Sequence, residues 1–115
     1  MNIDFIEVVE EPNRVCARFQ VDDHQQLVGV SRTLADSMWR ETPYEELLRR
    51  LGPLRIQLMQ LRGESQDVVP LIVSDDMHKD NDTLDIMSVG EAEQHLQEQI
   101  KDLMDDQKRI GFKAA

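Results

Sequence analysis

The chain has 115 residues and a formal net charge of -10; 40% of its residues are hydrophobic and only 4% are aromatic. This length predicts a single domain, residues 1–115, with a modest core of Leu, Val, Ile and Met side chains. The negative charge argues against nonspecific binding to nucleic acids or to anionic membranes, because phosphate contacts need Lys and Arg. No apolar run approaches the roughly 20 residues that a membrane-spanning helix needs.

The predicted compartment is the cytoplasm. Residues 1–11 contain early acidic side chains and no basic region, unlike a secretory signal peptide. Cys16 is the only cysteine, so the chain cannot form an internal disulfide, as is usual in reducing compartments. Arg14 and Arg18 lie on the same predicted strand face as Cys16, which makes this thiol a possible nucleophile. A half-buried structural thiol is the favoured interpretation.

Three strands are predicted near the amino terminus. Residues 3–10 are rich in Ile, Phe and Val without clean alternation, a pattern that a strand buried on both faces would show. Residues 14–21 alternate between apolar side chains on one face and mainly polar side chains on the other. A third strand is expected at 26–31, where Gly29 marks a bulge or a close backbone approach. Short polar turns between these strands favour an antiparallel meander.

A short helix is expected at 34–40, and residues 42–62 then have the most regular helical pattern of the chain. Thr42 and Glu45 have the spacing of a capping box, with Pro43 at the first helical position. Six apolar residues follow at steps of three and four, which is the spacing of one helical stripe. They are Tyr44, Leu47, Leu51, Leu54, Leu58 and Leu61.

Gly52 and Pro53 interrupt this stripe, and an uninterrupted helix would not tolerate them well. We therefore expect a broken helix, with one part ending at Gly52 and the next beginning at Pro53. A strand over residues 53–62 is the alternative, since its apolar side chains also alternate. Helix is favoured because both the propensities and the periodicity support it.

Residues 67–74 form an apolar run that predicts a further short strand. Pro70 cannot donate a ladder hydrogen bond, so this strand is expected at a sheet edge or as an extended segment. The polar, acidic residues 75–87 predict a mobile loop.

A long carboxy-terminal helix is predicted after this loop. Ser88 and Glu91 have the spacing of a second capping box, and the helix is expected to end near Ile110, before Gly111. The predicted fold class is α+β. It combines an antiparallel three-stranded meander packed on a broken helix at about 43–62, a short strand at about 67–74 and a long helix at about 89–110.

The acidic loop is a candidate metal site, because oxygen and imidazole ligands are concentrated in it. These ligands are Asp75, Asp76, His78, Asp80, Asp82 and Asp85. The loop lacks the glycine, the third ligand and the closing glutamate of a calcium-binding loop, so a solvated loop is favoured and no metal or cofactor is predicted. No zinc spacing, phosphate-binding glycine loop or nucleophile motif occurs, and no catalytic residue is predicted.

Arginines of the 42–62 segment are the second candidate site. Residues 25–62 contain six arginines and four acids, which makes them the only basic part of the chain. Arg49, Arg50 and Arg55 flank the Gly52-Pro53 pair, and Arg62 follows at the end of the segment. Internal pairing with acids of the amino-terminal strands or of the acidic loop is favoured over a partner site. A nucleic-acid site is disfavoured, since no aromatic side chains accompany the arginines.

Three classes of function fit these features. The preferred one is a small, acidic, non-catalytic protein that binds a protein partner with a basic surface, such as an inhibitor, an immunity- or antitoxin-like regulator, or an adaptor. The predicted partner-binding residues are Arg49, Arg50, Arg55, Arg62, Asp75, Asp76, Asp80 and Asp82. The first alternative is a structural or assembly subunit of a homo-oligomeric or phage-like particle, with a homodimer formed through the carboxy-terminal helix. A small enzyme or ligand-binding module without a recognisable motif is the second alternative.

Overall fold

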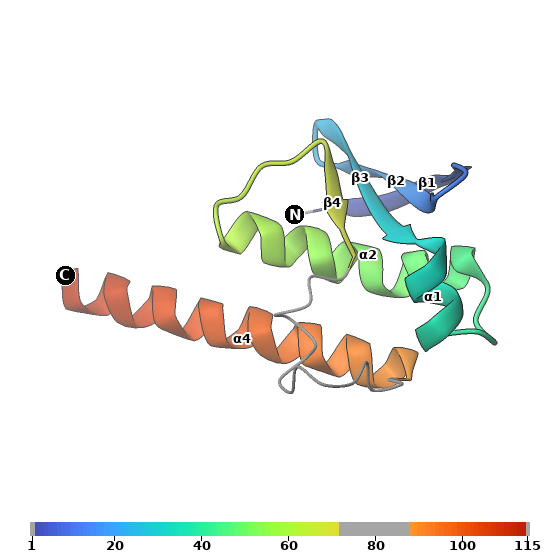
Figure 1. Ribbon diagram of the computed structural model, residues 1–115. Coiled ribbons are helices and arrows are strands. Elements are labelled where there is room, and N and C mark those ends of the chain that lie inside the picture. The colour runs from blue at the N-terminus through green and yellow to red at the C-terminus, as the bar shows by residue number, and fades with distance from the viewer. Residues whose placement is uncertain (1, 72–87, 115) are drawn as a thin grey trace.

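The computed structural model describes the backbone of residues 2–71 and 88–114, and the side chains of residues 2–71 and 88–107. These residues form an α+β fold, in which a four-stranded sheet accompanies three helices (Figure 1). The elements are β1 (Ile3–Glu10), β2 (Arg14–Val21), β3 (His24–Ser31), α1 (Arg32–Met38), α2 (Tyr44–Leu61), β4 (Val68–Pro70) and α4 (Val89–Ala114).

The sheet confirms the predicted meander and extends it by one strand. Its order is β1-β2-β3-β4; the first three strands are antiparallel, and β4 pairs parallel to β3. Helices α1 and α2 form the long connection that two parallel strands require. Pro70 lies on an edge strand as predicted, where its missing N–H interrupts no inner ladder.

The β1 strand is exposed on one side, contrary to the expectation that it is buried on both faces. It is the other edge of the sheet, and none of its residues is fully buried. The register shifts between Phe5 and Glu7, so Ile6 lies at a bulge and is 41% exposed. The irregular alternation of residues 3–10 therefore comes from this bulge.

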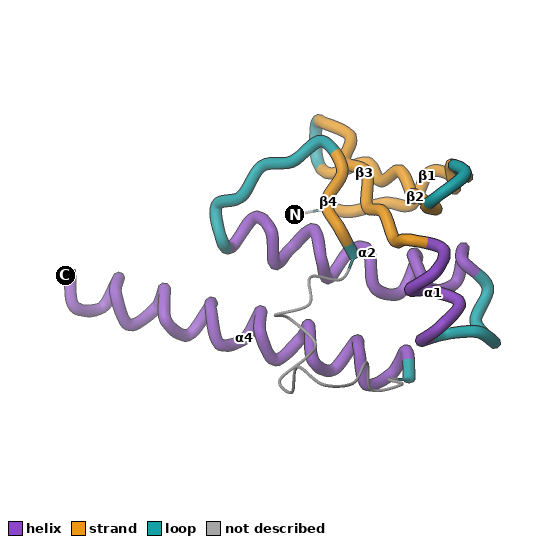
Figure 2. Tube along the Cα trace, in the orientation of Figure 1, coloured by secondary structure: helices purple, strands orange, loops and turns teal. Residues whose placement is uncertain are grey.

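The α2 helix lies between the sheet and α4, and it contacts both (Figure 2). The apolar face of β2 supplies the sheet side of the core, where Val15, Ala17, Phe19 and Val21 are all 0% exposed. Core side chains of α2 are equally buried: Leu47, Leu48, Leu51, Ile56 and Leu58. The helix prediction for residues 53–62 is thus confirmed.

The expected break in α2 is wrong, because one continuous helix contains both Gly52 and Pro53. An interior proline costs about 3 kcal/mol. Each buried apolar side chain of α2 stabilises the fold by about 1.5–3 kcal/mol, so their sum outweighs that cost. Gly52 has a packing role instead of ending a helix: a Cβ atom there would lie 2.5 Å from Cζ of Phe19.

The start of α2 also differs from the prediction. Pro43 is the N-cap residue, and no side chain caps the helix, so Thr42 and Glu45 do not form a capping box. Glu45 instead contacts Arg49 one turn along the helix, at 3.2 Å. The carbonyl of Pro43 accepts the first helical hydrogen bond, from the Leu47 amide at 3.0 Å.

The α4 helix packs along α2, and both run in the same direction (Figure 1). Its start is as predicted, since the Ser88 hydroxyl accepts a hydrogen bond from the Glu91 amide at 3.1 Å. Its predicted end is wrong, because the helix continues through Gly111 to Ala114. A single glycine in a helix costs only about 1 kcal/mol, which does not by itself end it. None of the described helices has the length and apolar character needed to cross a membrane.

Candidate functional site

The arginines of α2 are mostly engaged within the chain, as the favoured interpretation expected. Arg49 pairs with Glu45 at 3.2 Å and lies over the Phe5 ring, 4.3 Å from its centroid. Arg50 pairs with Glu46 at 3.9 Å and also with Glu93 of α4. Their carboxylate partners come from α2 and α4, whereas the sequence suggested the amino-terminal strands or the acidic loop. The Arg50–Glu93 pair links the two helices, and the pairs with Glu45 and Glu46 lie within α2.

Arg55 is not a surface residue, which corrects its assignment to an exposed arginine cluster. Its side chain is 1% exposed, and Nε donates a 2.9 Å hydrogen bond to the carbonyl of Pro70. Nη2 lies 4.0 Å from Oε2 of Glu64. Arg55 thus connects α2 to the edge strand β4 and has a structural role.

The remaining predicted partner-binding residues lie apart from this position. Arg62 is exposed at the end of α2, and its Nη2 lies 3.5 Å from Oε1 of Gln99 on α4. Asp75, Asp76, Asp80 and Asp82 lie outside the described residues, as does the loop predicted at 75–87. The structure therefore does not bring the predicted residues together into one described site.

The outer side of α4 carries a set of acidic residues that sequence reasoning did not single out. Glu91, Glu98 and Asp102 are exposed and Asp105 is partly buried; we call these four residues the acidic face. At 100° per residue their side chains point within about 60° of one another, along about 21 Å of helix. The opposite side of α4 faces α2 with Ala92, Leu96 and Ile100, which are all buried. A helical projection of the sequence would have revealed this division.

The acidic face is not neutralised by the described side chains. No Arg, Lys or His nitrogen of the described residues lies within 4 Å of these four carboxylates. Glu98 only accepts a 3.4 Å hydrogen bond from Gln94. Glu98 and Asp102 are four residues apart, and like charges at this spacing destabilise a helix by about 0.2–0.5 kcal/mol. The folded chain therefore keeps an electrostatic repulsion between Glu98 and Asp102 that no described basic side chain relieves.

A shallow groove separates α2 from α4 beside the acidic face. It is lined by Leu54 and Gln57 of α2 and by Ile100, Lys101, Met104 and Asp105 of α4, among others. Met104 is 42% exposed, and among the large hydrophobic side chains described only Ile6 is comparably exposed. Asp105 belongs to both the groove and the acidic face, so the two features are continuous.

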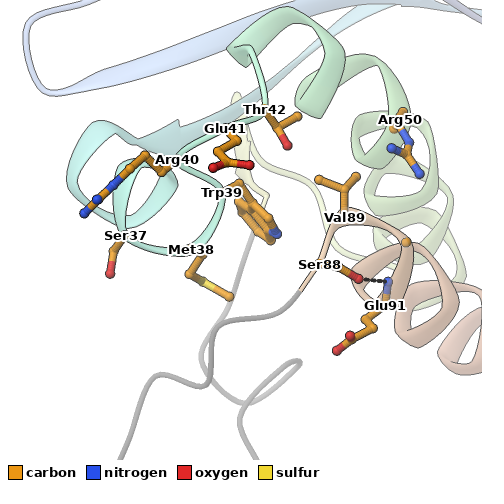
Figure 3. A pocket seen from close by; sticks show the side chains of 11 residues that line it. Ser37, Met38, Trp39, Arg40, Glu41, Thr42, Arg50, Ser88, Val89 and Glu91 are labelled. Atoms are coloured by element: carbon orange, nitrogen blue, oxygen red, sulfur yellow. Dashed lines mark hydrogen bonds between the residues drawn. The ribbon is translucent and has the colours of Figure 1, made fainter.

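A second hollow lies where α1 meets the start of α4 (Figure 3). Arg40 and Arg50 line it together with Glu41 and Glu91, and Glu91 forms no ion pair with either arginine. The buried indole N–H of Trp39 has no hydrogen-bond partner among the described residues. Its lining also carries the hydroxyl groups of Ser37, Thr42 and Ser88, with no His or Cys side chain among the described lining residues. We assign no function to this hollow.

Cys16 is more deeply buried than predicted, at 1% exposure. Gly29 leaves room for it, because a Cβ atom at position 29 would lie 3.2 Å from Sγ of Cys16 and 3.1 Å from Cγ1 of Val68. Gly29 is thus a point of close approach to the backbone, as expected, and the approaching atoms belong to side chains. Burial raises the pKa of the Cys16 thiol, although Arg14 opposes that change. A buried thiol with a raised pKa is a poor nucleophile, which favours the structural role.

The homodimer prediction rested on Leu96, Ile100 and Leu103 along one side of α4; Leu96 and Ile100 are buried within the chain and Leu103 is partly buried, and the homodimer stays a prediction. No three His, Cys, Asp or Glu side chains of the described residues gather as a metal site would.

Comparisons with family models, with curated proteins and with solved structures find no match to this chain. The acidic face and its adjoining groove are thus the strongest candidate site.

Proposed function

We propose that the chain is a non-catalytic protein that binds a basic protein partner through the acidic face of α4. An inhibitor, an immunity- or antitoxin-like regulator, or an adaptor would act in this way. The proposed compartment is the cytoplasm, since the single buried thiol of Cys16 forms no disulfide in the chain.

The observation that carries this proposal is the row of four carboxylates on one side of α4, none of which has a described basic nitrogen within 4 Å. By contrast, several arginines elsewhere lie beside a carboxylate: Arg14 contacts Glu11, Arg18 contacts Glu7 and Arg32 contacts Glu10. A row of carboxylates on a rigid helix attracts a basic surface, speeds its association and repels acidic competitors.

The test compares capture of a partner from an extract of the producing cells by three forms of the chain. In the first variant Glu98→Gln, Asp102→Asn and Asp105→Asn remove three charges from the acidic face. In the control variant Asp4→Asn, Asp23→Asn and Asp67→Asn remove three exposed charges from the sheet region. Both variants have the same net charge, so the comparison separates the position of the charges from their number.

We expect the wild-type chain and the control variant to recover the same stoichiometric partner, and the α4 variant to lose it. Recovery should also weaken as salt rises, because exposed charges are screened. Equal recovery by both variants would contradict the proposal. Failure of the wild-type chain to recover any partner, at both low and moderate salt, would contradict it as well.

A further inference from the structure

The groove between α2 and α4 has walls of different character. The α2 wall consists of the uncharged residues Leu54 and Gln57, whereas the α4 wall contains Gln97, Ile100, Lys101, Met104 and Asp105. Asp105 also belongs to the acidic face, whose other residues lie outside the groove. Met104 is half-exposed at this boundary. Methionine is flexible and polarisable, and is over-represented on surfaces that adapt to a partner. The groove thus suits an apolar side chain, and the acidic face beyond Asp105 suits cations.

We infer that this groove receives a basic amphipathic helix of the partner, an inference that rests on the proposed function. An apolar residue of that helix packs on Met104 and Leu54, and its Lys and Arg side chains point to the acidic face. A groove between two helices is the usual site for an amphipathic helix, whose anchors recur every three or four residues.

The spacing of the carboxylates defines the sequence pattern of the partner. Glu98 and Asp105 are seven residues apart, which is about 10.5 Å along α4, or two helical turns. A helix lying alongside would match them with basic residues at i, i+3 or i+4, and i+7. Lys101 also lines the groove. An acidic residue of the partner helix therefore fits opposite Lys101, and basic residues fit opposite the carboxylates.

Charge complementarity favours this occupant over a second copy of the chain. In a pair of copies meeting at the groove, the acidic face of each would lie close to that of the other. Like charges placed across an interface cost several kcal/mol. A basic helix instead relieves the repulsion that Glu98 and Asp102 retain.

The test uses two fluorescent peptides of about 18 residues, long enough for about five helical turns. One places Leu on a single helical stripe and Lys along one flank of it; the other has the same composition with Leu and Lys distributed around the helix. Fluorescence anisotropy then measures their affinity for the chain and its variants. We expect the patterned peptide to bind at least about tenfold more tightly, which corresponds to about 1.4 kcal/mol.

Two matched variants separate the groove from general hydrophobicity. Met104→Gln should weaken binding of the patterned peptide by about tenfold, as loss of an interface anchor does. Ile6→Gln changes the other comparably exposed hydrophobic residue and should leave affinity unchanged. In the wild-type chain the methyl resonance of Met104 should shift on peptide addition, and that of the buried Met38 should not. The methyl shifts are measured in the unaltered protein, so they do not depend on how a variant folds.

Equal affinity for both peptides, or equal effects of Met104→Gln and Ile6→Gln, would overturn the inference. If the charge variant of α4 still lost its natural partner, the proposed function would stand and only the groove assignment would fail. A wild-type dimer that Met104→Gln converts to a monomer, measured by light scattering, would assign the groove to a second copy and also overturn the inference.

Discussion

Replacement of Gly52 by alanine tests the close contact between α2 and the sheet. Alanine is favoured over glycine within a helix by about 1 kcal/mol, so an exposed helix would gain stability. The new Cβ atom, however, would lie 2.5 Å from Cζ and 2.6 Å from Cε2 of Phe19. The Phe19 ring is 0% exposed and packs edge-on against Phe5, with ring centroids 5.8 Å apart. It therefore has little room to move away.

Overpacking of a core typically costs about 1–3 kcal/mol. For a contact this short we take the upper part of that range, and after subtracting the helical gain we expect Gly52→Ala to destabilise the fold by about 1–2 kcal/mol. This corresponds to a decrease in melting temperature of about 5–10 °C. Urea unfolding followed by circular dichroism measures the free energy, and an unchanged slope would confirm that only stability has changed.

Gly90→Ala provides the matched control. Gly90 is exposed in the first turn of α4, and its Cβ atom would lie 3.9 Å from the Ser88 hydroxyl. It should be neutral or stabilise the protein by up to about 1 kcal/mol. Phe19→Leu should reduce the cost of Gly52→Ala when the two are combined, because the pair is in direct contact. A Gly52→Ala protein that is more stable than wild type would refute the packing of α2 on β2.

Three further changes test other parts of the fold. Arg55→Ala should lower the free energy of unfolding, measured in urea, by about 2–4 kcal/mol, because it removes a buried side chain and leaves the Pro70 carbonyl without its donor. Arg49→Ala should lower it by less than about 1 kcal/mol. Equal costs would contradict the structural role of Arg55. Leu51→Ala should cost about 2–5 kcal/mol as a cavity-forming change at a fully buried position, and a cost below that range would place α2 on the surface. Burial raises the pKa of Cys16, so the folded state holds the thiol proton more tightly and this contribution to stability is lost as pH rises above about 8.5. Wild type should therefore lose more stability than Cys16→Ala between neutral and alkaline pH, and parallel losses would exclude this contribution.

Local patterns predicted most elements because their residues follow the burial that the fold imposes. The alternation in 14–21 reflects the buried side of β2, and the stripe from Leu47 to Leu58 reflects the packing of α2. The Gly52-Pro53 pair led to the wrong prediction of a helix break, because the free-energy cost of these two residues in a helix is small compared with the free energy gained by burying the side chains around them. Only the proximity of Phe19, distant in sequence, explains why glycine is needed there.

Long-range contacts account for the other differences. The parallel pairing of β4 with β3 depends on a connection through two helices, which no local pattern reveals. Arg55 was expected at the surface because arginine usually is, and its hydrogen bond to Pro70 arises only when β4 joins the sheet. The acidic face was predictable in part, since Glu91, Glu98, Asp102 and Asp105 share one side of any regular helix. Only the arrangement of α2 and the sheet shows that the acidic face lacks basic neighbours among the described residues.

The central claim is that the carboxylates of α4 contact the basic groups of a partner. Zero-length carbodiimide cross-linking tests it directly, because this reagent joins only a carboxylate and an amine that already touch. In the purified complex, mass spectrometry should find Glu98, Asp102 or Asp105 joined to lysines of the partner. Asp4, Asp23 and Asp67 should not be joined to it. Cross-links confined to these sheet-side residues, with none on α4, would contradict the account.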